Sequence, residues 1–165
     1  MSENHSLLEQ LEKLLSWKRS KKFYAEKLGI TEYEVEELMK ELKQRGIYIG
    51  IGSNMTSDVQ YRKILKLGLG KYIDGIVTSE EAGEEKPHRK LFDLCVEKAG
   101  VMVEESIFIG DSIAHDVTGA QNIGMPVILY RPKENVNEIE WLQTEKGKCP
   151  AIAHFSQFFE AEKML

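Results

Sequence analysis

Three polar clusters in the sequence could together bind a phosphate group and a metal ion. Ser53 with Asn54 offers a hydroxyl and an amide to a phosphate oxygen, next to glycines that let the backbone approach a ligand. Lys86 offers a positive charge to a phosphoryl group. Asp111 and Asp116 place two carboxylates on one loop, and such hard oxygen ligands suit Mg²⁺.

Each cluster also has an ordinary structural explanation when it is considered alone. Serine and asparagine after a strand are common in turns, and a Lys-Pro pair before a helix is common loop sequence. Asp111 and Asp116 could be a helix N-cap and a solvated acid. The position of all three clusters at the ends of predicted strands favours binding, because open α/β sheets bind ligands at the carboxyl ends of their strands.

The chain after residue 46 alternates short apolar runs with amphipathic helical patterns, which is typical of parallel α/β domains. The apolar runs are continuous in Ile, Val and Phe, so the strands should be buried on both faces by helices. We expect a surface loop at 133–148 and Pro87 in the first turn of its helix. The predicted strands are 47–51, 73–78, 106–109, 126–130 and 151–155, and the predicted helices are 57–67, 87–99, 113–122 and 156–164.

The first 46 residues carry only helical patterns. An amphipathic stretch covers 6–16, a second helix is predicted over 21–28, and Thr31 with Glu34 forms a capping box for a third. We therefore divide the chain into a helical head, residues 1–46, and an α/β core, residues 47–165. The head is interpreted either as the remnant of a helical cap or as a helix-turn-helix-like segment.

Over residues 31–165 the sequence resembles the haloacid dehalogenase-like (HAD-type) hydrolases. The three clusters carry the resemblance, together with the run Gly119-Ala120-Gln121-Asn122-Ile123-Gly124-Met125 before the 126–130 strand. The resemblance implies Mg²⁺-dependent hydrolysis of a phosphomonoester on a Rossmann-like sheet. Carried over residue by residue, phosphate binding falls on Ser53, Asn54 and Lys86, with Lys86 the catalytic lysine, and Mg²⁺ binding falls on Asp111 and Asp116.

One motif of the family is missing from the sequence. In the family an apolar strand ends in Asp-x-Asp, where the first aspartate attacks phosphorus and the second acts as general acid and base. This chain contains no Asp-x-Asp, and no aspartate precedes Ser53. The resemblance therefore implies a hydrolase that is inactive or incomplete as this chain. The alternative is a non-catalytic module that binds a phosphorylated ligand or a protein, with a helical association segment.

The missing motif also has a structural consequence. In the family its strand lies between the strand before Ser53 and the strand before Asp111, so we expect an incomplete Rossmann-like parallel sheet. Each buried backbone group left unpaired costs about 1–3 kcal/mol. We expect the two flanking strands to be adjacent, or the sheet to be irregular there, or another segment to fill the position. Exposed inner strand edges also favour a homo-oligomer.

The head bears a weak resemblance to a helix-turn-helix over 18–45, through Ala25, Gly29 and Val35. Its recognition helix would be Thr31–Leu42, which is rich in glutamate, and carboxylates are repelled by nucleic-acid phosphates. The net charge of −5 also provides no basic field, so nucleic acid is not an expected partner. The expected partner is a small phosphorylated metabolite.

The lengths of the apolar runs and the positions of the cysteines bear on membrane association and cellular compartment. No apolar run approaches the ~18 residues that a membrane span requires, so no membrane association is expected. Cys95 and Cys149 lie in unlike sequence contexts and suggest neither a disulfide framework nor a zinc site. A reducing, cytoplasmic location is the resulting expectation.

Overall fold

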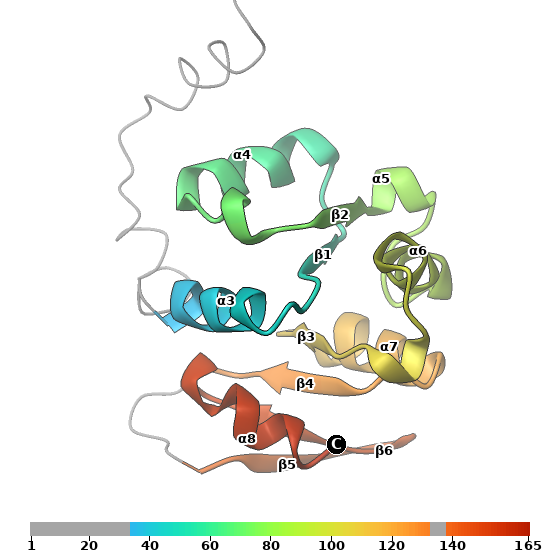
Figure 1. The fold of residues 1–165 in the computed structure, drawn as a ribbon. Helices are drawn as coiled ribbons and strands as arrows, with labels where there is room; N and C mark the ends of the chain where they lie inside the picture. The colour runs from blue at the N-terminus through green and yellow to red at the C-terminus, as the bar shows by residue number, and fades with distance from the viewer. Residues whose placement is uncertain (1–33, 133–137) are drawn as a thin grey trace, which may run out of the picture.

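The structure, a computed structural model, describes residues 34–132 and 138–165 and has the α/β fold that the sequence predicts (Figure 1). Helices alternate with short strands along the chain. In order, the elements are α3 (Glu34–Gln44), β1 (Gly50–Ser53), α4 (Ser57–Leu67), η1 (Gly70–Tyr72), β2 (Gly75–Thr78), α5 (Ser79–Ala82), α6 (Arg89–Ala99), η2 (Val103–Glu105), β3 (Phe108–Gly110), η3 (Ile113–Val117), α7 (Thr118–Asn122), β4 (Val127–Tyr130), β5 (Glu140–Thr144), β6 (Gly147–Ile152), η4 (Phe155–Gln157) and α8 (Phe158–Glu162).

The strands form two separate sheets. β1 and β2 make a parallel pair, whereas the second sheet has the order β3-β4-β6-β5, with β5 antiparallel to β6. Among the described residues no hydrogen-bonded strand pairing joins β1 to β3, so the two strands are not adjacent partners. The sheet is instead interrupted between them, which was the second of the expected outcomes.

Side chains fill the space beside Gly52 of β1. A Cβ atom placed on Gly52 would lie 3.0 Å from Leu91, 3.1 Å from Cys95 and 3.3 Å from Phe108. Leu91 and Cys95 belong to α6, and Phe108 belongs to β3. Packing between side chains therefore links the two sheets at the point where backbone pairing is absent.

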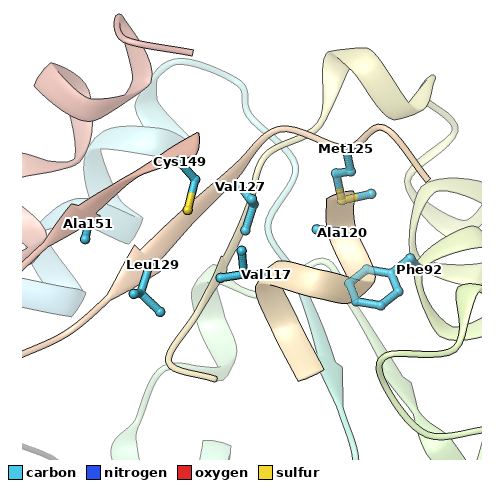
Figure 2. Packing of buried hydrophobic residues seen from close by; sticks show 8 residues of the cluster. All are labelled: Phe92, Val117, Ala120, Met125, Val127, Leu129, Cys149 and Ala151. Atoms are coloured by element: carbon cyan, nitrogen blue, oxygen red, sulfur yellow. The ribbon is translucent and has the colours of Figure 1, made fainter. Parts of the chain in front are cut away.

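β4 is buried on both faces, as the continuous apolar run predicted. On one face Val127 and Leu129 pack with side chains from α6, η3, α7 and β6, including Phe92 and Val117 (Figure 2). On the other face Ile128 and Tyr130 pack with a cluster that includes residues of α3 and α8. Helices thus cover both faces of β4.

Helix α3 contacts η1, just before β2, and η4, just after β6, so it links the two parts of the structure across the interruption. Its Leu38 belongs to the apolar cluster under the four-stranded sheet. At its C-terminal end, Lys43 Nζ donates to both carboxylate oxygens of Asp74, each at 2.7 Å. Asp74 in turn accepts a 2.8 Å hydrogen bond from the Ile49 N–H, just before β1.

The predicted surface loop at 133–148 is wrong over its described C-terminal part. Residues 140–152 form the β5–β6 hairpin, and β6 ends at Ile152 instead of running over 151–155. Pro150 disguised this strand, because proline is unusual in a central strand. Here β4 pairs with β6 only at Ala151 and Ile152, so Pro150 lies where β6 has no partner on the β4 side.

Other element boundaries differ from the prediction by a few residues. β1 occupies 50–53 and not 47–51. α6 starts at Arg89 with His88 as its N-cap, so Pro87 precedes the helix and is not in its first turn. The predicted helix 113–122 divides into η3, with π-helical hydrogen bonding, and α7.

Some expectations fall outside the described residues. These include Ala25 and Gly29 of the helix-turn-helix resemblance and the capping box at Thr31. In the described ranges, no helix combines the length and apolar character needed to cross a membrane.

Candidate functional site

Lys86 lies at the centre of the site. Its ammonium group donates a 3.0 Å hydrogen bond to the Gly52 carbonyl oxygen and forms a 2.7 Å ion pair with Asp116. The Phe108 ring lies below the same ammonium, 5.2 Å from Nζ to the ring centroid, within the range of a cation–π contact. The Lys86 side chain therefore connects the end of β1 to the loop after β3.

Asn54 holds the backbone of Lys86. Its Oδ1 accepts a 2.7 Å hydrogen bond from the Lys86 N–H, and its Nδ2 donates a 3.2 Å hydrogen bond to the Lys86 carbonyl. These reciprocal bonds connect two loops that are 32 residues apart in the chain. Asn54 thus fixes the loop before α6 against the end of β1.

Ser53 is buried at the carboxyl end of β1. Its hydroxyl accepts a 3.2 Å hydrogen bond from the Met55 N–H and donates a 3.3 Å hydrogen bond to Gln60 Oε1 on α4. The hydroxyl is therefore held beside the turn that connects β1 to α4. It lies one residue after Gly52, whose carbonyl binds Lys86.

The two aspartates have different environments. Asp116 is buried, and in addition to its ion pair its Oδ2 accepts a 3.0 Å hydrogen bond from the Ser112 N–H. Gly110 is required here, because a Cβ atom at that position would collide with the Asp116 carboxylate. Asp111 is exposed, and no hydrogen bond or ion pair to another described residue engages its carboxylate.

Ser112 and His115 form the cap of η3. The Ser112 hydroxyl oxygen accepts a 3.2 Å hydrogen bond from the His115 N–H and lies 2.9 Å from His115 Nδ1. The His115 ring is exposed. The arrangement accounts for the start of η3 and keeps the Ser112 N–H directed at Asp116.

Cys95 lies beside Gly52, close to Lys86. Burial raises the pKa of the Cys95 thiol to about 11, although the charges of Lys86 and Lys98 act in the opposite direction. A thiol with so high a pKa is scarcely ionised at neutral pH and is a poor nucleophile. Cys95 is therefore a packing residue of the site and not a reactive group.

The structure thus joins three of the five predicted site residues in one hydrogen-bonded cluster, in which Asn54 and Asp116 bind Lys86. Ser53 adjoins this cluster in the chain, between Gly52 and Asn54, but its own hydroxyl is bonded to Met55 and Gln60. Asp111 borders this cluster through the Ser112 N–H that follows it. Sequence reasoning missed Phe108 and Ser112 as neighbours of the charged pair. In the sequence, Phe108 was identified only as part of an apolar strand. The Ser112 N–H is a backbone donor, and almost every residue type has one, so the sequence does not mark it.

Asp111 and Asp116 could supply only two protein ligands to a divalent cation. No group of three or more His, Cys, Asp or Glu side chains suited to a metal ion occurs in the described part of the chain. Mg²⁺ is usually bound through one or two carboxylates, with phosphate oxygens and water completing its shell. Two aspartates, one of them free of protein partners among the described residues, meet that requirement.

The chain is similar in sequence to curated phosphatases. The chain spans about half the length of the curated relatives it matches. Ribulose-1,5-bisphosphate 5-phosphatase from Halopiger xanaduensis is 32% identical over 117 residues, which cover 71% of this chain and 48% of that protein. Glyceraldehyde 3-phosphate phosphatase from Methanothermobacter thermautotrophicus is 36% identical over 120 residues, which cover 73% and 53%.

The fold is shared with solved structures. The crystal structure of a HAD phosphatase from Thermococcus onnurineus superimposes with a TM-score of 0.68 at 21% identity, over 90% of this chain and 66% of that one. The model of the haloacid dehalogenase-like hydrolases matches residues 3–130. This match extends over most of the chain, which therefore belongs to the haloacid dehalogenase-like hydrolase family.

Proposed function

We propose that this chain provides the phosphate- and Mg²⁺-binding part of a phosphomonoester hydrolase whose substrate is a small phosphorylated metabolite. The observation that carries the proposal is the position of the Lys86 ammonium, held at 2.7 Å from Asp116 between the end of β1 and the loop after β3. Phosphate binding at this place is consistent with relatives that are named as phosphatases of sugar phosphates.

Each predicted residue has a role in this proposal. The Ser53 hydroxyl donates to a phosphate oxygen in place of Gln60, and Asn54 uses the amide N–H that is not bonded to Lys86. Lys86 offsets the negative charge of the phosphoryl group. Asp111 and Asp116 hold Mg²⁺, and a bound Mg²⁺ supplies further charge neutralisation at the phosphate oxygens.

Phosphate binding is tested directly by titrating the protein with orthophosphate in a calorimeter, with and without Mg²⁺. Lys86→Met should weaken orthophosphate binding by at least tenfold, whereas the control Lys90→Met, on the exposed side of α6, should leave it unchanged. Asp111→Ala should abolish the enhancement by Mg²⁺. Equal affinities for the parent protein and Lys86→Met would exclude the proposed site.

Catalysis by this chain alone is a separate question, because its sequence contains no Asp-x-Asp. That observation favours a second candidate function, a non-catalytic module that binds a phosphorylated ligand or a protein partner. The two functions are distinguished by Mg²⁺-dependent hydrolysis of p-nitrophenyl phosphate. Turnover that Asp111→Ala abolishes supports the hydrolase, whereas orthophosphate binding without turnover supports the binding module.

The interrupted sheet also bears on self-association. The inner edges of β1 and β3 have no strand partner among the described residues, and such edges favour pairing with another chain. We therefore propose a homo-oligomer through these edges. Light scattering coupled to size-exclusion chromatography measures it, and a monomer at all concentrations would rule it out.

A further inference from the structure

We infer that Asn54 is a positioning residue that places the Lys86 ammonium by holding the Lys86 backbone. The inference deepens the proposed phosphate site and rests on it for its functional meaning. Its structural basis is the pair of reciprocal hydrogen bonds, at 2.7 and 3.2 Å, between one side-chain amide and both backbone groups of residue 86.

The backbone groups of Lys86 belong to no regular element. α6 begins at Arg89, and α5 ends at Ala82. Among the described residues, Asn54 is the hydrogen-bond partner of both the Lys86 N–H and the Lys86 carbonyl. Pro87, which follows, has no N–H with which to hold the loop. The position of the Lys86 Cα atom therefore depends on Asn54.

Two hydrogen bonds to one amide define an orientation as well as a position. A single bond would let the peptide rotate about the bond axis, whereas the pair to N–H and C=O fixes its direction. The lysine side chain is a flexible four-carbon stem, so a fixed backbone alone does not fix the position of Nζ. Further contacts at the ammonium end are needed. Gly52 and Asp116 provide those contacts at the far end, 3.0 and 2.7 Å from Nζ.

Lys86 is thus held at both ends, and the two anchors share one segment. Gly52 binds the ammonium and Asn54 binds the backbone, with only Ser53 between them. The turn after β1 therefore determines the distance between the Ser53 hydroxyl and the Lys86 ammonium. Removal of the Asn54 amide should release the backbone of Lys86 and let Nζ leave its place near Asp116.

The test is the chemical reactivity of individual lysines, measured by reductive methylation and mass spectrometry on the full chain. Asn54→Ala should raise the methylation rate of Lys86 about tenfold, because both hydrogen bonds that hold its backbone are lost. Asn54→Asp should raise it less, because a carboxylate keeps the acceptor for the Lys86 N–H. Lys98, bonded to the Ile76 carbonyl and to Glu81, reports global unfolding, and exposed Lys90 reports the general rate of the reagent; neither should change.

The matched control is Asn122→Ala, which removes an exposed amide at the end of α7. It should leave Lys86 unchanged. An unaltered methylation rate of Lys86 in both Asn54 variants would overturn the inference. This measurement needs neither phosphate binding nor turnover, so its failure is distinguishable from failure of the proposed function.

A double-mutant cycle supplies the functional readout. If Asn54 acts through Lys86 as well as through its own N–H, then Asn54→Ala should weaken orthophosphate binding more in the parent protein than beside Lys86→Met. Fully additive losses would mean that Asn54 does not act through Lys86 and would overturn the inference. If no variant binds orthophosphate, the proposed function fails, and the methylation rates alone decide the inference.

Discussion

The ion pair between Lys86 and Asp116 is largely removed from solvent, with side-chain exposures of 12% and 5%. Loss of one partner from such a pair leaves an uncompensated buried charge. Asp116→Asn should therefore lower the free energy of unfolding by roughly 3 kcal/mol, measured by urea denaturation.

The matched control is Asp93→Asn, which breaks the exposed Arg89–Asp93 pair on α6. Exposed pairs contribute at most about 1 kcal/mol, so this variant should stay close to the parent protein. Equal losses for the two variants would contradict the special importance of the buried pair.

Gly110 is the second residue on which the site depends. Gly110→Ala should force the Asp116 carboxylate or the backbone of η3 to move, because the new methyl group would occupy the same space. Overpacking of this kind lowers stability by about 1–3 kcal/mol, which thermal unfolding would register. The control is Gly70→Ala, where the nearest heavy atom would lie at an ordinary 3.8 Å. Equal melting temperatures for the two variants would argue against a close contact.

Residue type and strand-end position predicted that the candidate residues would lie close together. Asn54, Lys86 and Asp116 are indeed hydrogen-bonded to one another. The reciprocal bonds between Asn54 and Lys86 were not predictable. They join side chain to backbone across 32 residues and depend on a rotamer and a loop conformation, which leave no periodic pattern in the sequence.

At the scale of elements, Asp74 anchors α3 to the start of β1. The hydrogen bonds from Lys43, and then from the Ile49 N–H, lower the pKa of Asp74 below its ordinary value. A lowered pKa in the folded state means that the ionised carboxylate stabilises the fold above pH ~4, the value in the unfolded chain. This stabilisation is lost as the pH falls further.

Asp74→Asn should accordingly reduce stability more at pH 7 than at pH 2.5, because the parent protein loses the stabilising charge of Asp74 as the pH falls through its lowered pKa. Urea denaturation at the two pH values measures the change. Asp58→Asn, which affects an exposed pair with Arg62 on α4, is the control. A loss for Asp74→Asn that is equal at both pH values would show that the charge is not responsible.

Strands with a clear burial pattern were predictable, and strands without one were not. β4 is apolar throughout because helices cover both of its faces, so its sequence identifies it. β5 is largely exposed, and its apolar Trp141 lies on the surface with Lys148 over the ring. A strand held mainly by backbone bonds to one neighbour needs little apolar sequence, which is why the hairpin was missed.

At the scale of the whole molecule, Cys149 is buried and Cys95 is half-buried, and neither forms a disulfide. Burial raises the pKa of the Cys95 thiol to about 11 and also raises the pKa of the Cys149 thiol. Because the thiolate is the reactive form, both thiols should react slowly with Ellman's reagent at pH 8. In guanidinium chloride both should react at once. Immediate reaction of the native protein would contradict the packing of α6 or β6.

The missing motif predicted the interruption of the sheet, but it did not predict which element would bridge the two parts. Helix α3, predicted as part of a separate head, contacts η1 and η4, and its Leu38 packs in the core of the four-stranded sheet. Sequence patterns identify which face of a helix is apolar. They do not identify which of two sheets that face will cover, because this depends on loop geometry and on the space left between strands.

The pairing of Lys86 with Asp116 has a consequence for how ligands would bind. The site contains one ammonium and two carboxylates, so its formal charge before any ligand arrives is negative. A phosphate dianion alone meets net repulsion, whereas a divalent cation at Asp111 would reverse the sign of the field. We therefore expect the two ligands to bind cooperatively. Since thermodynamic coupling is reciprocal, phosphate should raise the affinity for Mg²⁺ by the same factor by which Mg²⁺ raises the affinity for phosphate.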